Sequence, residues 1–401
     1  MKNLVERLEK IFLIGFLVTI PTQLGLHFWP EWSKVAGIRV DYLSPVLYLT
    51  DIFWMGWVVL KIKKGLEFKW GWRGWMALIL IGLNILVAVN KSEAVYRWLR
   101  WGQWGLTVWW MVADGEIIKK YLTKIIPIWI IVETFLAISQ IWLGRSVGGI
   151  WYWLGERTFN LNTVGIAQMS FDDRLLLRGY GTFSHPNSLA GFLMVSWWLW
   201  EMLKGKRENI LVVIMTVLGV AVSGSRLGWV ILGVLLIYKI LKGRPLSVLY
   251  KKIGLGLFLM GTGIIWMGSN FGGWDSESWE KRVRLSQEAA EMIEDNLWLG
   301  VGEGNFLVRL SEYSLNTNLW RQPVHNVPLL MVAELGMLGL LGWLNLGWSK
   351  IKKIKLRKAD WILVGIVAVT GMFDHYWVML PQNWWLLAIV IGFLFARNHN
   401  F

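Results

Sequence analysis

The sequence predicts an all-α fold, a polytopic integral membrane protein with about twelve transmembrane helices. The chain of 401 residues is 55% hydrophobic, and its mean hydropathy is +0.46, so it carries more apolar surface than a soluble core buries. It also contains 31 tryptophans. Tryptophan gathers at membrane interfaces because its ring is apolar and its N–H is polar. Finally, apolar runs of membrane-spanning length recur along the whole chain.

Each predicted span is an apolar run close to the roughly 17–25 residues that a helix needs to cross about 30 Å of hydrocarbon. Arg97, Arg100 and Gln103 interrupt the fourth run, and the seventh, eighth and twelfth are short. We expect one polytopic domain over residues 1–401. The runs lie near 11–29, 43–60, 74–89, 95–112, 125–142, 186–203, 209–223, 227–241, 248–268, 325–347, 361–380 and 384–396.

The distribution of basic residues supports this topology, because Lys and Arg accumulate on the cytoplasmic side of spans. With the amino terminus inside, the inward connections carry 26 of the 41 Lys and Arg residues, although the outward segments are longer. The net charge of +14 is then mostly a topology signal, with basic loops resting against anionic membrane lipid. No folded basic domain is predicted, so nucleic acid is not an expected partner. Cysteine is absent, which excludes disulfides and thiol chemistry.

Two outward segments, near 143–185 and 269–324, are too long to be simple turns, and long ordered loops are usually functional. The second is an expected extracytoplasmic loop before the third-last span. Within it, the stretch SWEKRVRLSQEAAEMIEDNLWLG has apolar residues at helical spacing, which predicts an amphipathic helix on the outer face of the membrane. These residues are Trp279, Val283, Ala290, Ile293 and Leu297.

Three separated segments bring polar residues to the same outer face. The block RGYGTFSHPNSLAG ends the first long outward segment, the turn SGSR joins two spans, and the second loop ends in a His-Asn pair. The candidate functional residues are Arg178, His185 and Asn187 in the block, Arg226 in the turn, His325 and Asn326 after the loop, and Arg282 within it.

Each of these residues also has a purely structural interpretation. An arginine beside a span often snorkels to the interface. A histidine at a helix mouth is often an anchor or a cap, and an asparagine at a helix start, such as Asn187, often caps the helix. The stretch GVGEGNF, at 300–306, lacks the preceding strand and the Lys-Ser/Thr ending of a phosphate loop, so we interpret it as a tight turn.

The joint pattern resembles the O-antigen ligase and polymerase superfamily, polytopic enzymes that move lipid-linked glycans outside the cytoplasmic membrane. The resemblance covers nearly the whole chain: the spans, the large loop, the RGYGTFSHPNSLAG block, the SGSR turn and the histidine after the loop. His325 and Gly336 match the His-x10-Gly pattern of the ligases. The companion Arg-x3-Leu pattern departs at Arg226, where Val230 replaces leucine. Ligase and polymerase therefore both stay open.

The resemblance implies transfer of a glycan from an isoprenoid-diphosphate donor to a glycan, lipid or protein acceptor. A departing diphosphate gathers negative charge, which guanidinium groups stabilise, so Arg178 and Arg226 are expected to bind it. A sugar hydroxyl needs a base, and neutral imidazole, with a reference pKa of about 6.5, suits that role at His325. Attack opposite the diphosphate inverts the anomeric centre. His185, Asn187, Asn326 and Arg282 are expected to contact substrate, in addition to the two arginines.

No metal and no cofactor are expected. The outward segments contain no Asp-x-Asp pair, and Asp172-Asp173 and Glu294-Asp295 are adjacent carboxylates that point in different directions. On a continuous helix, Gly336 returns to nearly the same face as His325 and would let another helix pack closely. The expected location is the cytoplasmic membrane, with multiple passes and an extracytoplasmic active site.

Two other classes of function are also considered. A transporter or flippase has a similar number of spans and carries charged residues near the midplane, where Asp51, Glu133, Glu201 and Glu334 are candidates. The two halves of this chain differ, however, because the large loop has no early counterpart. A non-catalytic scaffold needs no converging arginines and histidine, so it is the third alternative.

Overall fold

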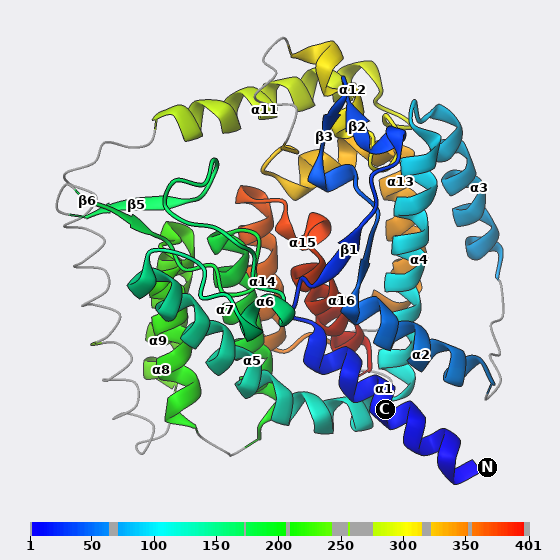
Figure 1. The fold of residues 1–401 in the computed structure, drawn as a ribbon. Coiled ribbons are helices and arrows are strands. Elements are labelled where there is room, and N and C mark those ends of the chain that lie inside the picture. The colour runs from blue at the N-terminus through cyan, green and yellow to red at the C-terminus, as the bar shows by residue number, and fades with distance from the viewer. Residues whose placement is uncertain are drawn as a thin grey trace.

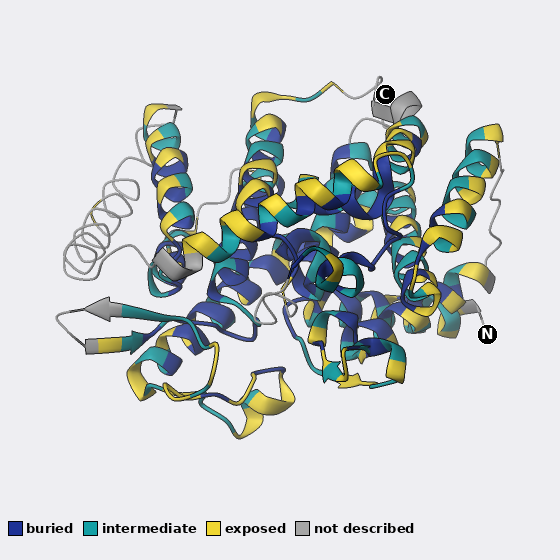
Figure 2. Cartoon of the chain, turned by 90° about the horizontal axis from the view of Figure 1, so that it is seen from above, coloured by how far each residue is buried: buried dark blue, intermediate teal, exposed yellow. Residues whose placement is uncertain are grey.

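The computed structural model describes residues 2–63, 71–171, 174–205, 209–242, 276–314, 322–351 and 355–396, together with Gly256. The described chain is mostly helical, as predicted. Figure 1 shows most of the long helices side by side, with α11 (Ser276–Asp295) lying across the end of the bundle opposite the amino terminus. Seen from that end in Figure 2, buried residues gather at the centre and exposed residues line the outside.

Eleven of the predicted apolar runs contain a helix in the structure. The ninth, at 248–268, lies outside the described residues apart from Gly256. The helices are α1 (Lys2–Thr19), α2 (Leu49–Lys63), α3 (Trp72–Val87), α4 (Lys91–Ala113), α5 (Gly115–Leu143), α7 (Pro186–Leu203), α8 (Ile210–Val222), α9 (Arg226–Lys242), α13 (Val327–Ile351), α14 (Lys358–Phe373) and α16 (Pro381–Ala396).

Two predicted runs end earlier than expected. The run 11–29 stops being helical at Thr19, and the run 361–380 stops at Phe373, before the short helix α15 (Tyr376–Met379). Beyond α14, Tyr376 and Trp377 are buried in a separate short helix, whereas beyond α1 Leu26 is paired in β1 and is exposed. Hydropathy records burial, and a buried strand or loop satisfies it as well as a helix does. The predicted ends were therefore wrong.

Three small antiparallel pairs of strands were not predicted. They are short, and strands of two to four residues leave little periodicity in a sequence. The pairs are β1 (Gly25–His27) with β4 (Val46–Tyr48), β2 (Lys34–Val35) with β3 (Ile38–Arg39), and β5 (Gln168–Phe171) with β6 (Arg174–Leu177). The remaining short elements are the 3₁₀ turns η1 (Glu31–Ser33) and η2 (Asp41–Leu43) and the helices α6 (Ile150–Trp153) and α12 (Phe306–Tyr313).

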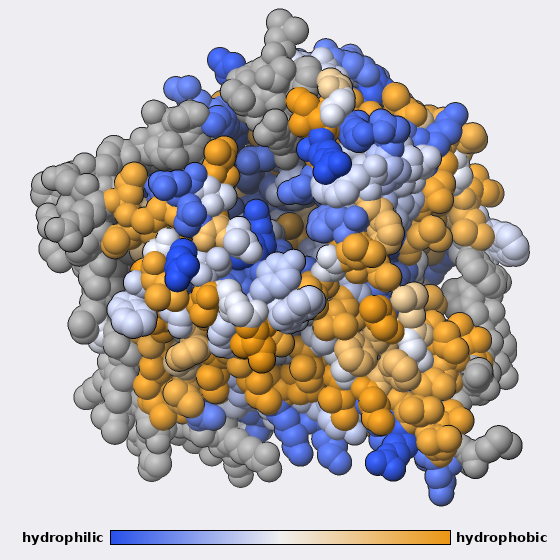
Figure 3. Space-filling model, in the orientation of Figure 1, coloured by the Kyte–Doolittle hydropathy of each residue, from blue (hydrophilic) through white to orange (hydrophobic). Residues whose placement is uncertain are grey.

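Two of the described helices are long and apolar enough to cross a membrane, α5 over Gly115–Leu143 and α13 over Val327–Gly347. The shorter helices α3, α8 and α16 are also apolar. Figure 3 shows an apolar band across the lower half of one face, with hydrophilic residues above it and below it. This distribution is that of a chain whose middle faces hydrocarbon and whose ends face water.

On α11, the buried side chains are Leu285, Ala289 and Met292, which pack with α12 and with the start of α13. The apolar stripe noted in the sequence lies elsewhere on the same helix: Trp279 and Val283 are exposed. One helix can carry apolar residues on two faces, because each residue is rotated by about 100° around the helix axis from the residue before it. The core contact of α11 therefore uses a face that spacing alone did not identify.

Helix α13 is broken at Gly336, which has φ 64° and ψ 178°. The loop 297–302 fills the break: Val301 and Gly302 N–H donate to the carbonyls of Ala333 and Glu334, at 2.9 and 3.1 Å. In return, the N–H groups after the break donate to carbonyls of the loop, for example Met337 to Leu297 at 2.8 Å. Inside an apolar bundle every backbone group needs such a partner, so loop and helix complete one another.

This break corrects the expected role of Gly336. A Cβ there would lie 2.4 Å from Gly300 N and from Trp298 O, and its φ is left-handed, so glycine is needed for the loop to approach. His325 also lies before the helix, which begins at Val327. The expectation that the two residues share one continuous helical face is therefore wrong. The stretch GVGEGNF does contain the expected tight turn, in which Asn305 N–H donates to Gly302 O at 3.0 Å, and its first three residues also belong to the inserted loop.

Polar side chains inside the bundle hold that loop. Asn84 on α3 donates through Nδ2 to the carbonyls of Leu299 and Glu334, at 3.1 and 2.8 Å, and its Oδ1 accepts from Glu303 N at 2.9 Å. Trp101 Nε1 on α4 donates to Glu303 Oε1 at 2.8 Å. Glu334 has a structural contact in the same region, since its Oε1 accepts from the backbone of Phe306 at 3.2 Å.

A second polar anchor on α5 positions the RGYGTF block. The fully buried side chain of Gln140 accepts from the N–H groups of Tyr180 and Gly181, both at 2.9 Å, and donates to the Gly181 carbonyl at 2.8 Å. About two turns earlier on α5, Glu133 accepts from Thr182 N at 2.8 Å. A Cβ on Gly181 would lie 2.4 Å from Glu133 Oε2, so the glycine permits this close approach. Segment 178–184 is therefore fixed to the bundle core.

Candidate functional site

Arg178 leads directly from β6 into the anchored block. Its Nε donates to the carbonyl of Ser223 at 2.7 Å, and the next residue, Gly179, donates its N–H to Val222 O at 2.8 Å. The turn SGSR thus lies directly against Arg178. Its Gly224 has φ 62°, and a Cβ there would lie 3.0 Å from Arg178 Nε. The glycine therefore allows both the turn and the close approach of the guanidinium.

A hydrogen-bonded chain of side chains links Arg178 to the start of two other helices. Arg178 Nη2 donates to Asn187 Oδ1 at 2.7 Å. Asn187 sits in the first turn of α7 and donates through Nδ2 to Asp374 Oδ2 at 3.1 Å. Asp374 follows the last residue of α14. The amide of Asn187 therefore connects a cation on one side with a carboxylate on the other.

Asp374 is also the partner of two histidines. Its Oδ1 lies 3.4 Å from His325 Nδ1 and 3.5 Å from His375 Nδ1. The two imidazole rings pack together, with centroids 4.8 Å apart and planes inclined by 60°. On its other side, His375 Nε2 lies 3.1 Å from the hydroxyl of Tyr42, which belongs to η2 near the amino terminus. Four distant segments therefore meet at one carboxylate.

The electrostatics favour a charged Asp374 and a neutral His375. Burial alone would raise the pKa of Asp374, but the hydrogen bond from His325 and the nearby histidines hold it well below its usual value. Burial, together with the neighbouring His325, lowers the pKa of the His375 imidazole to about 3. An ionised Asp374 opposite His325 Nδ1 fixes the ring orientation and leaves Nε2 directed elsewhere. That nitrogen lies 3.4 Å from Gln322 Oε1.

His185 is the N-cap of α7, and its Nδ1 accepts from the backbone N–H of Asn187 at 3.1 Å. Burial is the main reason that its pKa falls to about 3, with Arg178, His325 and Arg282 among the charges acting on it. The lowered pKa favours a neutral ring at His185, close enough to Arg178, Arg282 and His325 to interact with them. His185 supports Asn187 directly, and its role as a substrate contact is a prediction.

Of the predicted arginines, Arg226 is the first residue of α9 and is exposed. Burial, with the neighbouring cations Arg226 and Arg282, lowers the pKa of Arg178 to about 10, so Arg178 still carries its charge near neutrality. Arg282 reaches from α11 to donate to the carbonyl of Phe373 at 2.7 Å, next to Asp374. The three cations therefore lie close enough together for Arg226 and Arg282 to act on Arg178.

Asn326 is committed to the local backbone. Its Oδ1 accepts from Leu329 N at 2.9 Å, which caps the start of α13, and its Nδ2 donates to Met372 O at 3.0 Å. The described side chain therefore fixes α13 against α14. Its predicted contact with substrate has no support from this geometry.

Sequence reasoning missed Asp374, His375 and Tyr42. A signal was present, because the adjacent Asp-His pair interrupts the apolar run 361–380, and ionisable residues inside such a run are rarely accidental. Among the described residues, a metal could be held by His325, Asp374 and His375, whose ligand atoms lie within 4.8 Å of one another. The expectation of a metal-free site stays a prediction.

Two comparisons relate the chain to known proteins. No curated protein matches the chain. A family model described as O-antigen ligase matches residues 210–344. This range contains Arg226, Arg282 and His325. Arg178, Asn187 and Asp374 lie outside it and are linked to His325 by hydrogen bonds and contacts. Over residues 210–344, the chain is therefore similar to the O-antigen ligase family.

Proposed function

We propose that the protein is a glycosyltransferase that moves a glycan from an isoprenoid-diphosphate carrier to an acceptor on the outer face of the cytoplasmic membrane. The family match supports a membrane enzyme of the glycan ligase or polymerase type. The observation that carries the finer proposal is the chain of side chains from Arg178 through Asn187 and Asp374 to His325. This chain connects the proposed phosphate-binding cation, Arg178, with the proposed base, His325.

The proposed reaction is a direct displacement. The acceptor hydroxyl oxygen attacks the anomeric carbon of the donor, and the bond from that carbon to the diphosphate oxygen breaks with its electron pair on the oxygen. His325 Nε2 takes the hydroxyl proton, while the Asp374 carboxylate stabilises the imidazolium from the Nδ1 side. Attack from the face opposite the leaving group inverts the anomeric centre.

Arg178 and Arg226 are proposed to meet the charge that grows on the leaving diphosphate. Guanidinium groups are suited to this because they grip phosphate oxygens in a planar fork and stay charged. Arg178 is already oriented by Ser223 and Asn187, so it needs little reorganisation during the reaction. Arg282 and His185 are proposed to contact the donor on the same side.

The proposed topology keeps one polytopic domain with about twelve spans, an internal amino terminus, and an extracytoplasmic loop over 269–324. It is supported by the distribution of basic residues, by the apolar band in Figure 3, and by the position of α11 across the end that holds His325 and Asp374. The donor lipid would then enter sideways from the outer leaflet.

Ligation and polymerisation differ in the acceptor. A ligase transfers to a lipid or protein anchor, and a polymerase uses a second lipid-linked glycan. His325 and Gly336 fit the ligase pattern, whereas Val230 departs from it. We therefore propose transfer from the isoprenoid carrier, with ligation as the preferred function and polymerisation as the alternative.

A flippase is less well supported, because the four carboxylates that suggested it have structural partners. Asp51 pairs with Arg100 at 2.6 Å, and Glu201 pairs with Lys204 at 2.6 Å. Glu133 and Glu334 bind backbone N–H groups of Thr182 and Phe306. Groups used in this way hold the fold together rather than line a transport path.

The test is reconstitution of the purified full-length chain in lipid nanodiscs with defined isoprenoid-diphosphate-linked glycans and candidate acceptors. We expect a covalent product with inverted anomeric configuration, together with release of the isoprenoid diphosphate. Movement of the donor across a sealed bilayer without any new glycosidic bond would favour the flippase instead.

A further inference from the structure

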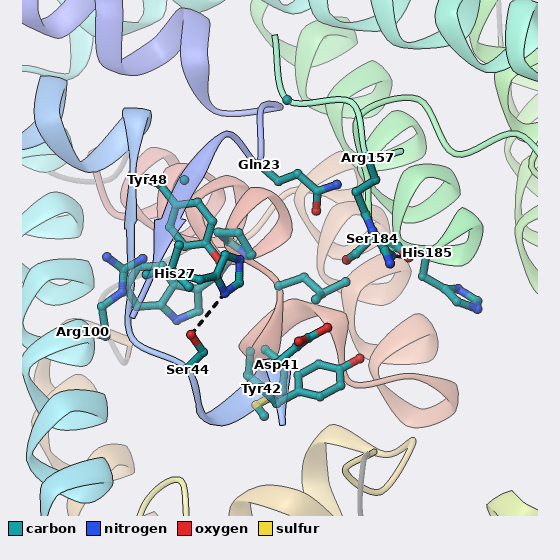
Figure 4. A pocket seen from close by; sticks show the side chains of 18 of the residues that line it. Gln23, His27, Asp41, Tyr42, Ser44, Tyr48, Arg100, Arg157, Ser184 and His185 are labelled. Carbon is teal, nitrogen blue, oxygen red and sulfur yellow. Dashed lines mark hydrogen bonds between the residues drawn. The ribbon is translucent and has the colours of Figure 1, made fainter. Parts of the chain in front are cut away.

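A cavity of about 440 Å³ lies beside the histidine cluster. Its walls come from the amino-terminal segment 23–48, from α4, from the loop 152–165 and from the stretch between α15 and α16. Figure 4 shows His27, Ser44 and Tyr48 on one side of it, Arg157, Ser184 and His185 on the other, and Asp41 and Tyr42 below. This volume falls within the range of roughly 300–1,000 Å³ typical of small-molecule sites.

The cavity reaches the proposed base. His185 and Gln322 both line it, and Gln322 Oε1 lies 3.4 Å from His325 Nε2. Tyr42 lines it as well, and its hydroxyl lies 3.1 Å from His375 Nε2. A molecule held in the cavity can therefore extend one of its groups past Gln322 to Nε2 of His325, the ring nitrogen that does not face Asp374.

The walls combine aromatic faces with hydrogen-bonding groups. The aromatic residues in the lining are Tyr42, Tyr48, Tyr96, Trp101, Tyr152 and Trp384. Gln23, His27, Asp41 and Ser44 add an amide, an imidazole, a carboxylate and a hydroxyl. Saccharides suit such walls, because the C–H faces of a sugar ring pack on aromatic rings while its hydroxyls donate to carboxylates and accept from amides.

The charges of the wall do not suit a diphosphate. Two of the three arginines in the lining come from α4 and are paired, Arg97 with Glu93 at 2.7 Å and Arg100 with Asp51 at 2.6 Å. The third, Arg157, is exposed and donates to the carbonyl of Ser184 at 3.1 Å. Arg178, Arg226 and Arg282 are not among the described residues that line the cavity. The anionic end of the donor therefore belongs with those three cations, and the cavity is left for an uncharged part of a substrate.

We propose that this cavity is the acceptor subsite, which holds the terminal saccharide of the acceptor and directs its attacking hydroxyl to His325. The inference rests on the proposed transfer reaction. It divides the site at His325, with the donor diphosphate on the side of Arg178 and the acceptor sugar between Tyr42, Tyr152 and His185. It also makes the amino-terminal segment 23–48, outside the matched family region, a determinant of acceptor choice.

The test compares two neighbouring aromatic residues of α6. Tyr152 lines the cavity and is half exposed, whereas Trp153 beside it is more exposed and is not in the lining. Tyr152→Ala is expected to raise the KM for acceptor by about 10-fold or more while the KM for donor changes by less than about 2-fold. Asp41→Asn, at an exposed lining position, should act in the same direction.

Trp153→Ala should leave both constants unchanged. The assay uses the full chain in nanodiscs with the acceptor that supports turnover by the unaltered protein. An unchanged acceptor KM in both Tyr152→Ala and Asp41→Asn, or an equal rise in the donor KM, would overturn the assignment of the cavity.

A second measurement separates this inference from the reaction itself. A saccharide released from the envelope glycans of the producing cell, and labelled at its reducing end, is titrated into the protein without any donor. Binding that weakens in Tyr152→Ala but not in Trp153→Ala supports a saccharide site even if no transfer is seen, in which case the proposed reaction fails alone. Equal binding by all three proteins, or no binding by the unaltered protein, would overturn the saccharide site.

Discussion

The Nδ1 atom of His325 lies 3.4 Å from Oδ1 of Asp374, although 49 residues separate the two along the chain. The loop before α13 supplies the histidine, and the end of α14 supplies the carboxylate. An acid that fixes one imidazole nitrogen determines which nitrogen can take a proton, so this pair defines the direction of the proposed base. The same carboxylate binds Asn187 and, through it, Arg178.

Asp374→Asn should reduce transfer by about 10²- to 10⁴-fold, because the amide cannot stabilise an imidazolium at His325. The KM for donor should change much less than kcat, since Asp374 does not contact the carrier in the proposed site. Asp295→Asn, on α11 and remote from the histidines, is the matched control, and its rate should equal that of the unaltered protein. Steady-state kinetics on folded, monodisperse protein would measure this. A near-normal kcat in Asp374→Asn would show that the carboxylate does not assist His325 as a base.

Arg226→Lys should lower kcat by about 10- to 100-fold although the charge is kept, because an ammonium group cannot form the planar two-pronged contact with phosphate oxygens. Arg284→Lys makes the same change at an exposed position on α11 and should have no effect. Product formation from a radiolabelled donor measures both variants. Normal turnover by Arg226→Lys would remove the residue from the proposed diphosphate site.

Gly336→Ala should destabilise the protein by about 3 kcal/mol or prevent its accumulation, since the residue has a left-handed φ and its Cβ would overlap the inserted loop. Gly365→Ala is the control. No atom lies within 4 Å of a Cβ at Gly365, and alanine in a helix should be neutral or stabilise by roughly 0.5–1 kcal/mol. Thermal unfolding in detergent distinguishes the two, and equal melting temperatures would argue against the broken helix.

Stability should fall as the pH drops below about 6.5. Burial lowers the folded pKa of His185 and His375 to about 3, whereas both titrate near 6.5 in the unfolded chain, so the unfolded state binds more protons across this window. Each histidine then costs roughly 1.4 kcal/mol per pH unit below 6.5. Asp374, whose folded pKa is lowered, stabilises the fold above about 4, and the loss of this stabilisation in stronger acid adds to the same trend.

The melting temperature in detergent, followed from pH 7.5 to 5, tests this dependence. It should decrease steadily, and His375→Gln should reduce the slope by about half because one of the two titrations is removed. A melting temperature that stays level or rises over this range would contradict the assignment of two neutral, buried imidazoles.

Much of the helical framework could be predicted from the sequence, because burial in an apolar surrounding requires long apolar runs and hydropathy records them. The ends of those runs were less certain, as residues 20–29 and 374–380 show: β1 pairs with β4 through contacts that are distant in sequence. The inserted loop at Gly336 was also out of reach, since a left-handed glycine and an ordinary helical glycine look alike in a sequence.

For the site, residue chemistry singled out Arg178, Asn187 and His325, and the structure joins these three in one hydrogen-bonded chain. Residue chemistry did not identify Asp374, which joins Asn187 to His325, because the carboxylate lay within an expected span. It also assigned substrate contact to Asn326, whose amide is used by the backbone of α13 and α14. A side chain that binds other side chains, distant in sequence, produces no recognisable spacing pattern in the sequence.

The most direct test of the account is single-turnover transfer by His325→Ala, measured with purified protein in nanodiscs, an isoprenoid-diphosphate-linked glycan and an acceptor used by the unaltered chain. The account predicts that the variant folds, keeps its melting temperature and still binds the donor, but forms no product on the timescale of the unaltered protein. Product formation at an undiminished rate would contradict it.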